Sequence, residues 1–420
     1  MPVTSDAAAR TPQGFRANEA QRWTAIILAG VTGNASAIIK PLLIGTYVAH
    51  YSFTPRAAGY LLTSEMTAAA LAILVSAVLF AHLSQRKFVL AALVMILIGN
   101  VGAASIDVAG ASSLFGWRIV AGLGHGFALG PVGAAVARVK QPDRLAGLMS
   151  VAVMGSAAAL SFLIPHLQAS IGGRGLFVAM AATIPLGVIA MRYFPDGAGV
   201  DQGKKSALPP MPPWRVTLFA SLGLFAWYLV VGGYWPYVEQ FARAAHLGYA
   251  EAARVLGWAT LISVLGASLS IFVGESLGRM RTLSALFAIQ IAAVLTMLLG
   301  GSHFFAYAAS ASLFVFAWIA LFPYLMGLMS QIDPGGRLNG LLYMTALLGY
   351  AIGPAAAGYV SGHGATLASG LLEVQQLVLG LLLVAATMLL TLAARNRRPA
   401  SMDQAAPLRL DHSGTAPTDA

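Results

Sequence analysis

The sequence predicts an all-α membrane protein of twelve transmembrane helices, arranged as two pseudo-symmetric six-helix bundles. Three observations lead to this prediction. The 420 residues are 58% hydrophobic and only 10% charged, with a mean hydropathy of +0.75, whereas a soluble domain is about 25% charged. Twelve apolar segments are each long enough to cross a bilayer. The two halves of the chain also repeat each other.

Each predicted helix is a run of roughly 20 mainly apolar residues, which is the length that spans the hydrocarbon core of a bilayer. The twelve segments are residues 24–48, 57–81, 88–108, 114–137, 145–167, 174–194, 215–238, 252–274, 282–301, 303–330, 338–361 and 370–394. Only a short turn around Ser302 divides the ninth segment from the tenth.

The internal repeat is visible at one fixed spacing. Residues 144–148 (Arg-Leu-Ala-Gly-Leu) recur as residues 337–341 (Arg-Leu-Asn-Gly-Leu), and 337 − 144 = 193. The same spacing relates Arg86 to Arg279. Two similar halves of membrane-length segments are typical of carriers that bind a substrate between the halves and move one half against the other.

The distribution of basic residues predicts the orientation. With the N-terminus in the cytoplasm, the inside segments hold nineteen Lys and Arg residues and the outside loops hold four, as the positive-inside rule requires. The proline-rich stretch between the sixth and seventh helices has the composition of a flexible linker. We therefore predict a cytoplasmic segment at 1–22, bundles at 23–194 and 215–396, a cytoplasmic linker at 195–214 and a disordered cytoplasmic tail at 397–420.

The composition also excludes several classes of function. The net charge of +10 lies mostly in alternate loops and forms no basic patch for nucleic acid. The chain has no cysteine, and its eight histidines show no metal-ligand spacing. The glycines of residues 122–126 lie in an apolar segment without the Gly-Lys-Ser/Thr of a nucleotide loop. We expect no cofactor, no metal and no enzymatic activity, and a monomer in a bacterial inner membrane.

Several motifs resemble those of the major facilitator superfamily of secondary transporters. Residues 118–126 are similar to the Arg-x-x-x-Gly-x-Gly-x-Gly pattern of the fourth helix in that family. The turn after the eighth helix resembles the family's acidic and basic signature, and the eleventh helix carries a Gly-Pro pair. The resemblance implies a role in conformational change for six residues of these motifs. They are Glu275, Gly278, Arg279, Arg281, Gly353 and Pro354.

Two motifs depart from the family pattern. The turn after the second helix, residues 82–87, lacks both the acidic residue and the glycine of the signature. The fifth helix also lacks the motif that antiporters of the family carry, since Pro165 has no glycine before it. The second departure favours symport over drug/proton antiport.

Three ionisable residues lie inside predicted helices: Lys40, Glu65 and Arg118. Each charge at a helix centre costs roughly 2.5 to 3.5 kcal/mol even on the lenient insertion scale, so we expect them to pair around water or substrate. A carboxylate substrate that bound Arg118 would leave Glu65 less compensated and more easily protonated. The alternatives are a purely structural Glu65–Arg118 pair and a Lys40 side chain that reaches to the outer interface.

Two further polar residues are candidates. His125 lies on the same helix face as Arg118 and is either a proton relay or a histidine satisfied by a backbone carbonyl, which we favour. Asn34 contacts either substrate or another helix. The resemblance places the first, fourth, seventh and tenth helices around a central cavity, and the aromatic residues expected to line it are Trp227, Tyr228, Tyr234, Trp318 and Phe322. For Trp235 and Tyr237 we prefer an interfacial aromatic belt.

The combined interpretation is a secondary active transporter that works by alternating access. We expect proton-coupled symport of a small organic solute, anionic or aromatic, with Glu65, Arg118 and His125 in proton coupling and Asn34, Lys40 and Arg118 among the substrate ligands. The alternative is a proton-coupled efflux antiporter of drugs or metabolites with the same fold. A third class, a membrane-embedded enzyme or a transporter-like sensor, is less favoured.

Overall fold

A computed structural model of the chain describes residues 18–79, 83–195, 212–272, 277–300, 303–333 and 339–396. The predicted N-terminal segment, linker and C-terminal tail, together with Glu275, lie wholly or mostly outside these ranges. The described residues are helical throughout, apart from short turns. Ten of the helices are long and apolar enough to cross a membrane, or eleven when one bent pair counts as a single span.

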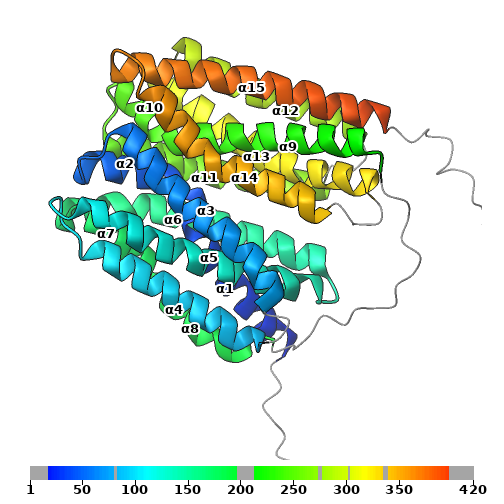
Figure 1. Ribbon diagram of the computed structural model, residues 1–420, viewed down its shortest axis with the longest axis horizontal. Helices are drawn as coiled ribbons and strands as arrows, with labels where there is room; N and C mark the ends of the chain where they lie inside the picture. The colour runs from blue at the N-terminus through cyan, green and yellow to red at the C-terminus, as the bar shows by residue number, and fades with distance from the viewer. Residues whose placement is uncertain are drawn as a thin grey trace, which may run out of the picture.

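The first half of the chain forms the lower group of helices in Figure 1. Its helices are α1 (Glu19–Ile38), α2 (Lys40–His50), α3 (Pro55–Leu79), α4 (Gln85–Ala104), η1 (Ala111–Ser113), α5 (Leu114–Ala137), α6 (Pro142–Ile171), α7 (Arg174–Ala182), α8 (Ile184–Ala190) and η2 (Met191–Tyr193).

The second half forms the upper group (Figure 1). Its helices are α9 (Trp214–Tyr234), η3 (Trp235–Tyr237), α10 (Val238–Ala244), α11 (Tyr249–Phe272), α12 (Arg279–Gly300), α13 (Phe304–Ile332), α14 (Asn339–Ser361) and α15 (Leu367–Arg395). Each of the twelve predicted segments thus corresponds to one helix or to consecutive helical pieces.

The breaks within three predicted helices are the main differences from the sequence prediction. The first predicted helix is two helices that meet at an angle of 51° around Ile39. The sixth is divided at Thr183, just before Pro185. The seventh is interrupted by η3, which contains Pro236, and continues past its predicted end as α10. Proline explains where these breaks occur, because it has no backbone N–H to donate to the preceding helical turn and its ring restricts the backbone. In the first helix, Pro41 is the second residue of α2.

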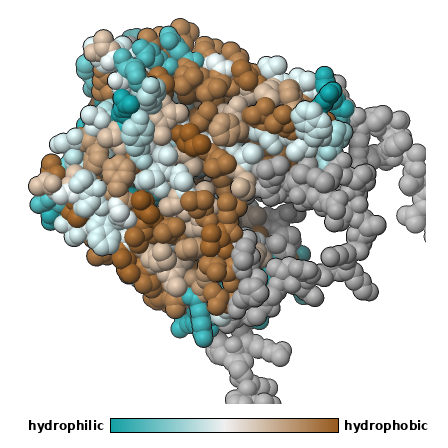
Figure 2. All heavy atoms as spheres, viewed as in Figure 1, coloured by the Kyte–Doolittle hydropathy of each residue, from teal (hydrophilic) through white to brown (hydrophobic). Residues whose placement is uncertain are grey.

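The two halves meet along α3 and α14 and along α6 and α11. Large apolar side chains such as Leu71, Leu186 and Leu299 are exposed on the outside, and Figure 2 shows apolar residues spread over the visible face. A soluble protein does not expose apolar surface on this scale. The exposed surface therefore fits contact with lipid, and the protein is an integral membrane protein.

Glycines in α5 set the spacing within the first half. A Cβ atom at Gly122 would lie 2.3 Å from the backbone oxygen of Glu65, and one at Gly126 would lie 2.1 Å from that of Ala69. A Cβ atom at Gly124 would lie 2.8 Å from the backbone oxygen of Ala92. Because no side chain fits at these positions, α5 packs directly on the backbones of α3 and α4. This contact brings the polar side chains of the three helices together.

Candidate functional site

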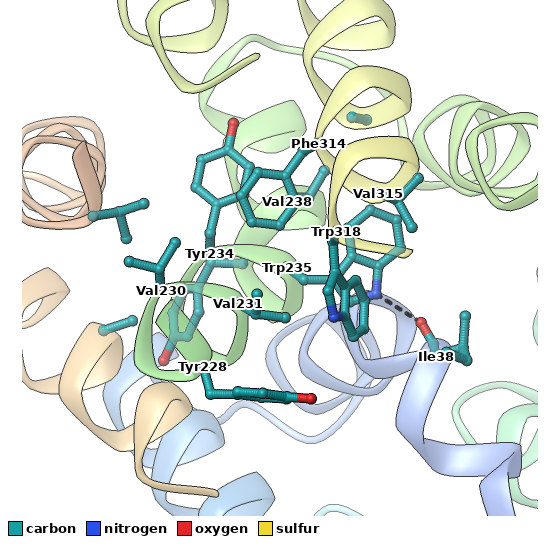
Figure 3. Packing of buried hydrophobic residues seen from close by; sticks show 14 of the residues in the cluster. Ile38, Tyr228, Val230, Val231, Tyr234, Trp235, Val238, Phe314, Val315 and Trp318 are labelled. Carbon is teal, nitrogen blue, oxygen red and sulfur yellow. Dashed lines mark hydrogen bonds between the residues drawn. The ribbon is translucent and has the colours of Figure 1, made fainter. Parts of the chain in front are cut away.

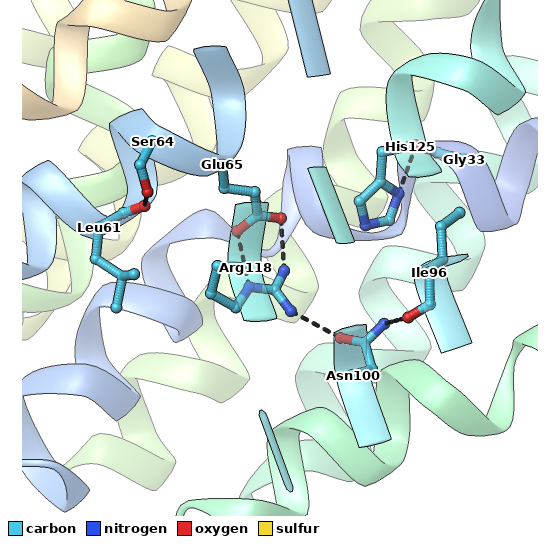
Figure 4. A network of polar contacts seen from close by, with 8 residues as sticks. All are labelled: Gly33, Leu61, Ser64, Glu65, Ile96, Asn100, Arg118 and His125. Carbon is cyan, nitrogen blue, oxygen red and sulfur yellow. Dashed lines mark hydrogen bonds and ion pairs between the residues drawn. The ribbon is translucent and has the colours of Figure 1, made fainter. Parts of the chain in front are cut away.

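The polar centre of the first half is a bidentate ion pair between α3 and α5 (Figure 4). The Arg118 guanidinium donates from Nε to Glu65 Oε2 at 3.0 Å and from Nη2 to Glu65 Oε1 at 2.5 Å. Both side chains are fully buried. The expected pairing of these two charges is present, and its geometry is the parallel two-bond form that gives the strongest charge-assisted contact.

Asn100 of α4 completes this centre, and the sequence analysis missed it. Its Oδ1 accepts from Arg118 Nη1 at 2.7 Å, while its Nδ2 donates to the backbone oxygen of Ile96 at 3.0 Å. All three guanidinium nitrogens therefore have partners inside the first half. The available sequence signal was a polar amide in the middle of a predicted helix. Only the packing of α4 on α5 shows that this amide bonds to Arg118.

Lys40 differs from the expectation. It is the first residue of α2, at the break after α1, and it is fully buried. Its Nζ has no hydrogen-bond partner among the described residues and lies 3.1 Å from the centroid of the Tyr350 ring. The alternative in which Lys40 reaches the outer interface is therefore wrong, because the side chain is enclosed between the two halves. Its stabilising contact is a cation–π interaction with the second half.

The helix break beside Lys40 is held by aromatic side chains of the second half. The indole Nε1 of Trp235 donates to the backbone oxygen of Ile38 at 2.8 Å (Figure 3). The Tyr350 hydroxyl donates to the backbone oxygen of Ala37 at 3.1 Å. These donors satisfy carbonyl groups next to the break, which matters because an unpartnered carbonyl is costly in a membrane interior.

The interfacial positions predicted for Trp235 and Tyr237 are wrong. Both side chains are buried, with exposed fractions of 1% and 0%. The Tyr237 hydroxyl lies 2.8 Å from the backbone oxygen of Pro55 and 3.2 Å from that of Pro354. The continuation of the chain through η3 and α10 turns these two aromatic residues toward the first half, where they bond to the backbone oxygens of Ile38 and Pro55.

The Tyr350 ring that contacts Lys40 belongs to a cluster of aromatic rings at the contact between the halves. The Tyr350 ring lies 5.9 Å from the Trp318 ring and 6.1 Å from the Tyr228 ring, and the Trp235 and Trp318 rings are 6.3 Å apart. These five residues, hereafter the seam cluster, are Lys40, Tyr228, Trp235, Trp318 and Tyr350. Tyr228 and Trp318 were predicted as ligands, whereas Trp235 and Tyr350 were not.

Two of the other predicted aromatic ligands have partners within the second half, although the Trp227 ring also lies 4.9 Å from the Tyr228 ring of the seam cluster. Trp227 donates from Nε1 to Gln290 Oε1 of α12 at 2.9 Å, and the Tyr234 hydroxyl lies 2.7 Å from Ser310 Oγ of α13. Both residues are fully buried inside the second half. Phe322 is 40% exposed. These positions favour packing roles for Trp227 and Tyr234.

The two polar candidates, Asn34 on α1 and His125 on α5, both form hydrogen bonds to backbone oxygens of α1. His125 Nδ1 lies 3.0 Å from the backbone oxygen of Gly33, and its Nε2 has no partner among the described residues. Because a carbonyl oxygen only accepts, Nδ1 carries a proton. Asn34 Nδ2 donates to the backbone oxygen of Gly30 in its own helix at 2.9 Å. Neither side chain bonds to another polar side chain in the described parts of the chain.

The residues predicted for conformational change occupy two places. Gly278 has a φ of +78° just before α12, a backbone conformation that favours glycine. Arg279 donates from Nη1 to the backbone oxygen of Gly327 at 3.4 Å, and Arg281 is exposed. A Cβ atom at Gly353 would lie 2.4 Å from the backbone carbon of Gly232, so this glycine brings α14 against α9.

Pro354 lies where α14 meets the first half. A Cβ atom on Gly59 of α3 would be 2.4 Å from the Pro354 oxygen. The next residue, Ala355, donates its backbone N–H to Thr63 Oγ1 at 2.9 Å. The absence of a side chain at Gly59 thus permits direct contact between the halves.

The hydrogen bonds that join the two halves within the described residues all lie between mid-membrane and one end of the molecule. That end holds the α2–α3 and α10–α11 loops and is called the outer end below, after the orientation predicted from charge. The bonded pairs are Ala37–Tyr350, Ile38–Trp235, Thr46–Tyr249, Pro55–Tyr237 and Thr63–Ala355.

The sequence profile of the Major Facilitator Superfamily matches residues 25–354. The chain belongs to the Major Facilitator Superfamily. It is therefore a membrane transporter and not an enzyme, and its all-helical fold is the one that the sequence motifs predicted.

Solved structures of other transporters share this fold. A crystal structure of a D-xylose–proton symporter has a TM-score of 0.72 at 13% identity, covering 88% of this chain and 96% of that chain. The human organic anion transporter MFSD10 has a TM-score of 0.65 at 14% identity, covering 89% and 100%. A bacterial homologue of the human lysosomal transporter Spinster, inward-facing and unoccupied, has a TM-score of 0.66 at 15% identity, covering 91% and 100%. No curated protein matches the sequence closely enough to count as a relative.

Proposed function

We propose that this transporter is a proton-coupled symporter for a small organic anion with an aromatic or apolar body. The observation that supports this proposal is the buried ammonium of Lys40, which has no hydrogen-bond partner among the described residues and lies between the two halves against the Tyr350 ring. A buried cation without a hydrogen-bond partner is costly. An anionic group bound there would supply the missing partner, and the aromatic rings of the seam cluster would pack on the apolar body.

Lys40 is a better anion ligand than Arg118. The guanidinium of Arg118 already bonds to Glu65 and Asn100, so a substrate carboxylate would first have to break an ion pair within the first half. Lys40 requires no such exchange, because within the described structure its ammonium lies on an aromatic face and makes no hydrogen bond. The proposal therefore moves the anion from Arg118 to Lys40.

Proton coupling then follows from electrostatics. Glu65 interacts electrostatically with Lys40 as well as with Arg118. An anion bound to Lys40 neutralises one of the two cations that stabilise the Glu65 carboxylate, so Glu65 takes up a proton more readily. His125 also interacts electrostatically with Glu65 and has a free Nε2 in the described structure. It is the candidate relay for that proton.

We further propose that the structure represents a state open toward the cytoplasm. The inter-half hydrogen bonds lie toward the outer end, and the charge distribution predicts that both termini are cytoplasmic. An inner-membrane carrier in this state would release its anion and proton together into the cytoplasm.

Ligand binding to the purified protein tests the anion site. The probes are a panel of monocarboxylates with aromatic or apolar bodies, each paired with its neutral amide, measured by thermal stabilisation. We expect carboxylates to stabilise the wild type and amides to fail. Lys40→Met should weaken the binding of the best carboxylate by roughly 10- to 100-fold, because a hydrogen bond to a charged group contributes about 1.5 to 3 kcal/mol.

The matched control is Lys40→Arg, which keeps the positive charge and should retain most of the binding. Equal stabilisation by carboxylates and amides, or unchanged binding by Lys40→Met, would show that the site is not an anion site. Proton movement in proteoliposomes then distinguishes the two modes of transport. Symport moves protons with the carboxylate, whereas the antiport alternative moves them against it.

A further inference from the structure

A second buried carboxylate, Glu239, lies at the outer end between the two halves. Glu239 belongs to α10 of the second half and is fully buried. A Cβ atom on Gly45 of α2 would lie 2.7 Å from both Cδ and Oε2 of Glu239. The carboxylate therefore packs directly on the backbone of the first half, and only a glycine at position 45 leaves room for it.

The hydrogen bonding of this carboxylate is incomplete. Oε2 accepts from Gln240 Nε2 at 2.5 Å, but Oε1 has no hydrogen-bond partner among the described residues. The Nε of Arg243 lies 3.3 Å from Oε1 without a hydrogen bond, and the Arg243 side chain is 32% exposed. Water screens a partly exposed cation. Arg243 therefore compensates a buried negative charge only in part.

The groups around Glu239 supply little further positive charge. On α11, Tyr249 packs on Gly45 and its hydroxyl lies 3.4 Å from Thr46 Oγ1. On α2, the His50 ring is 6.5 Å from the Tyr249 ring. The other titratable or polar side chains near α10 are Tyr307 of α13, Tyr237 of η3 and the neutral Gln375 of α15. Lys40 of α2, Arg254 of α11 and Arg395 of α15 also lie on elements packed against α10, but Arg243 is the one cation that the described structure places within ion-pair distance of Glu239.

The position of Glu239 links its charge to the movement of the halves. When the outer end opens, α10 separates from α2 and water reaches the carboxylate, where the ionised form is stable. When the outer end closes, the carboxylate returns to a dry junction, where an ionised group is costly when one oxygen accepts no hydrogen bond and its ion pair is partly exposed. A proton removes that cost, so closure and proton uptake favour each other.

We propose that Glu239 is a second proton-binding site of the transport cycle, filled from the outside, and that its protonation holds the outer end closed. This inference deepens the proposed proton-coupled symport. It predicts that acidic external pH favours the closed outer end and that alkaline external pH favours the open one. Glu65 cannot serve in this way, because its hydrogen-bond partner in the described structure, Arg118, moves with its own half.

Cysteine accessibility tests the proposal directly, since the chain has no native cysteine. The reporter is Thr63→Cys on α3, whose native side chain accepts a hydrogen bond from α14 across the junction. A membrane-impermeant maleimide is added outside proteoliposomes that hold the protein in its predicted orientation. We expect labelling to slow by roughly tenfold from mildly alkaline to mildly acidic external pH.

In this background, Glu239→Gln should label slowly at every pH, because a neutral side chain favours closure throughout. The matched control is Glu251→Gln, which removes an exposed carboxylate near the same end and should keep the full pH response. Glu65→Gln should also keep it while losing proton-driven uptake. A pH response retained by Glu239→Gln, or lost in Glu65→Gln alone, would overturn the inference and leave the proposed symport intact.

Arg243→Gln gives a second test that leaves Glu239 in place. Loss of the cation paired with Glu239 should move the pH midpoint of labelling upward, because a less compensated carboxylate keeps its proton to higher pH. An unmoved midpoint would contradict the assignment even if Glu239→Gln failed to fold. The labelling rate should also not depend on external sodium. A rate that changes when sodium is replaced by choline, but not when the pH changes, would contradict the assignment.

Discussion

Glu65 and Glu239 are both buried carboxylates, but they are held in different ways. Glu65 receives two hydrogen bonds from Arg118, and both residues belong to the first half. Glu239 receives one from its sequence neighbour Gln240 and packs on Gly45 of the opposite half. A carboxylate held within one rigid half keeps its environment when the halves move. A carboxylate between the halves changes its environment with every cycle.

The same contrast separates the two buried cations. Arg118 has partners for all three guanidinium nitrogens within the first half. Among the described residues, the Lys40 ammonium has no hydrogen-bond partner and lies against the Tyr350 ring of the second half. The difference teaches that a charge paired within one half also holds that bundle together, whereas a charge between the halves is exposed to every movement of one half against the other. Substitutions of the first kind should reduce stability, and those of the second kind should shift the conformational equilibrium.

The largest expected effect is on stability and comes from Arg118→Leu. The substitution leaves Glu65 as a buried charge without its partner, which costs about 3 to 5 kcal/mol. We expect a strongly lowered melting temperature of the detergent-purified protein. The double variant Glu65→Leu with Arg118→Leu should recover most of the loss, because it removes both charges. Arg144→Leu, at an exposed arginine of α6, is the control. Normal melting of the single variant would break the comparison.

A smaller effect is expected from Tyr350→Phe. This substitution removes the hydrogen bond to the Ala37 carbonyl and keeps the ring beside Lys40. The closed outer end should lose about 1 kcal/mol, or roughly a fivefold shift toward the open state, with little change in melting temperature. Labelling of Thr63→Cys from outside measures the shift. Tyr359→Phe, at a half-exposed tyrosine of the same helix, should leave labelling unchanged.

The smallest effect is expected from Asn34→Ala. The Asn34 amide bonds to a carbonyl of its own helix, and such local bonds contribute little to a helix interior. We expect less than about a twofold change in affinity for the best carboxylate of the panel and a stability change within about 0.5 kcal/mol. A tenfold loss of affinity would place Asn34 in the substrate site and would extend the seam cluster along α1.

Much of the fold could be predicted because the bilayer imposes helix length and apolar composition. The Glu65–Arg118 pair was also predictable, since two opposite charges inside one bundle have few other partners. The contact that Lys40 makes was not predictable, because its partner is an aromatic ring on a helix far along the chain. Glu239 was missed because it follows Pro236, where the apolar run ends and a loop was expected. The burial of such residues depends on how helix ends pack against distant helices, and the residues next to them in the sequence do not show this packing.

The bend between α1 and α2 has a consequence for hydration. The carbonyl groups of Ala37 and Ile38 take their hydrogen bonds from side chains of the opposite half. Once the outer end separates, those donors leave, and the hydrocarbon of the lipid offers no replacement. Solvent must therefore wet the bend as the halves part. The kink in the first membrane segment makes the entry of water a structural requirement of opening.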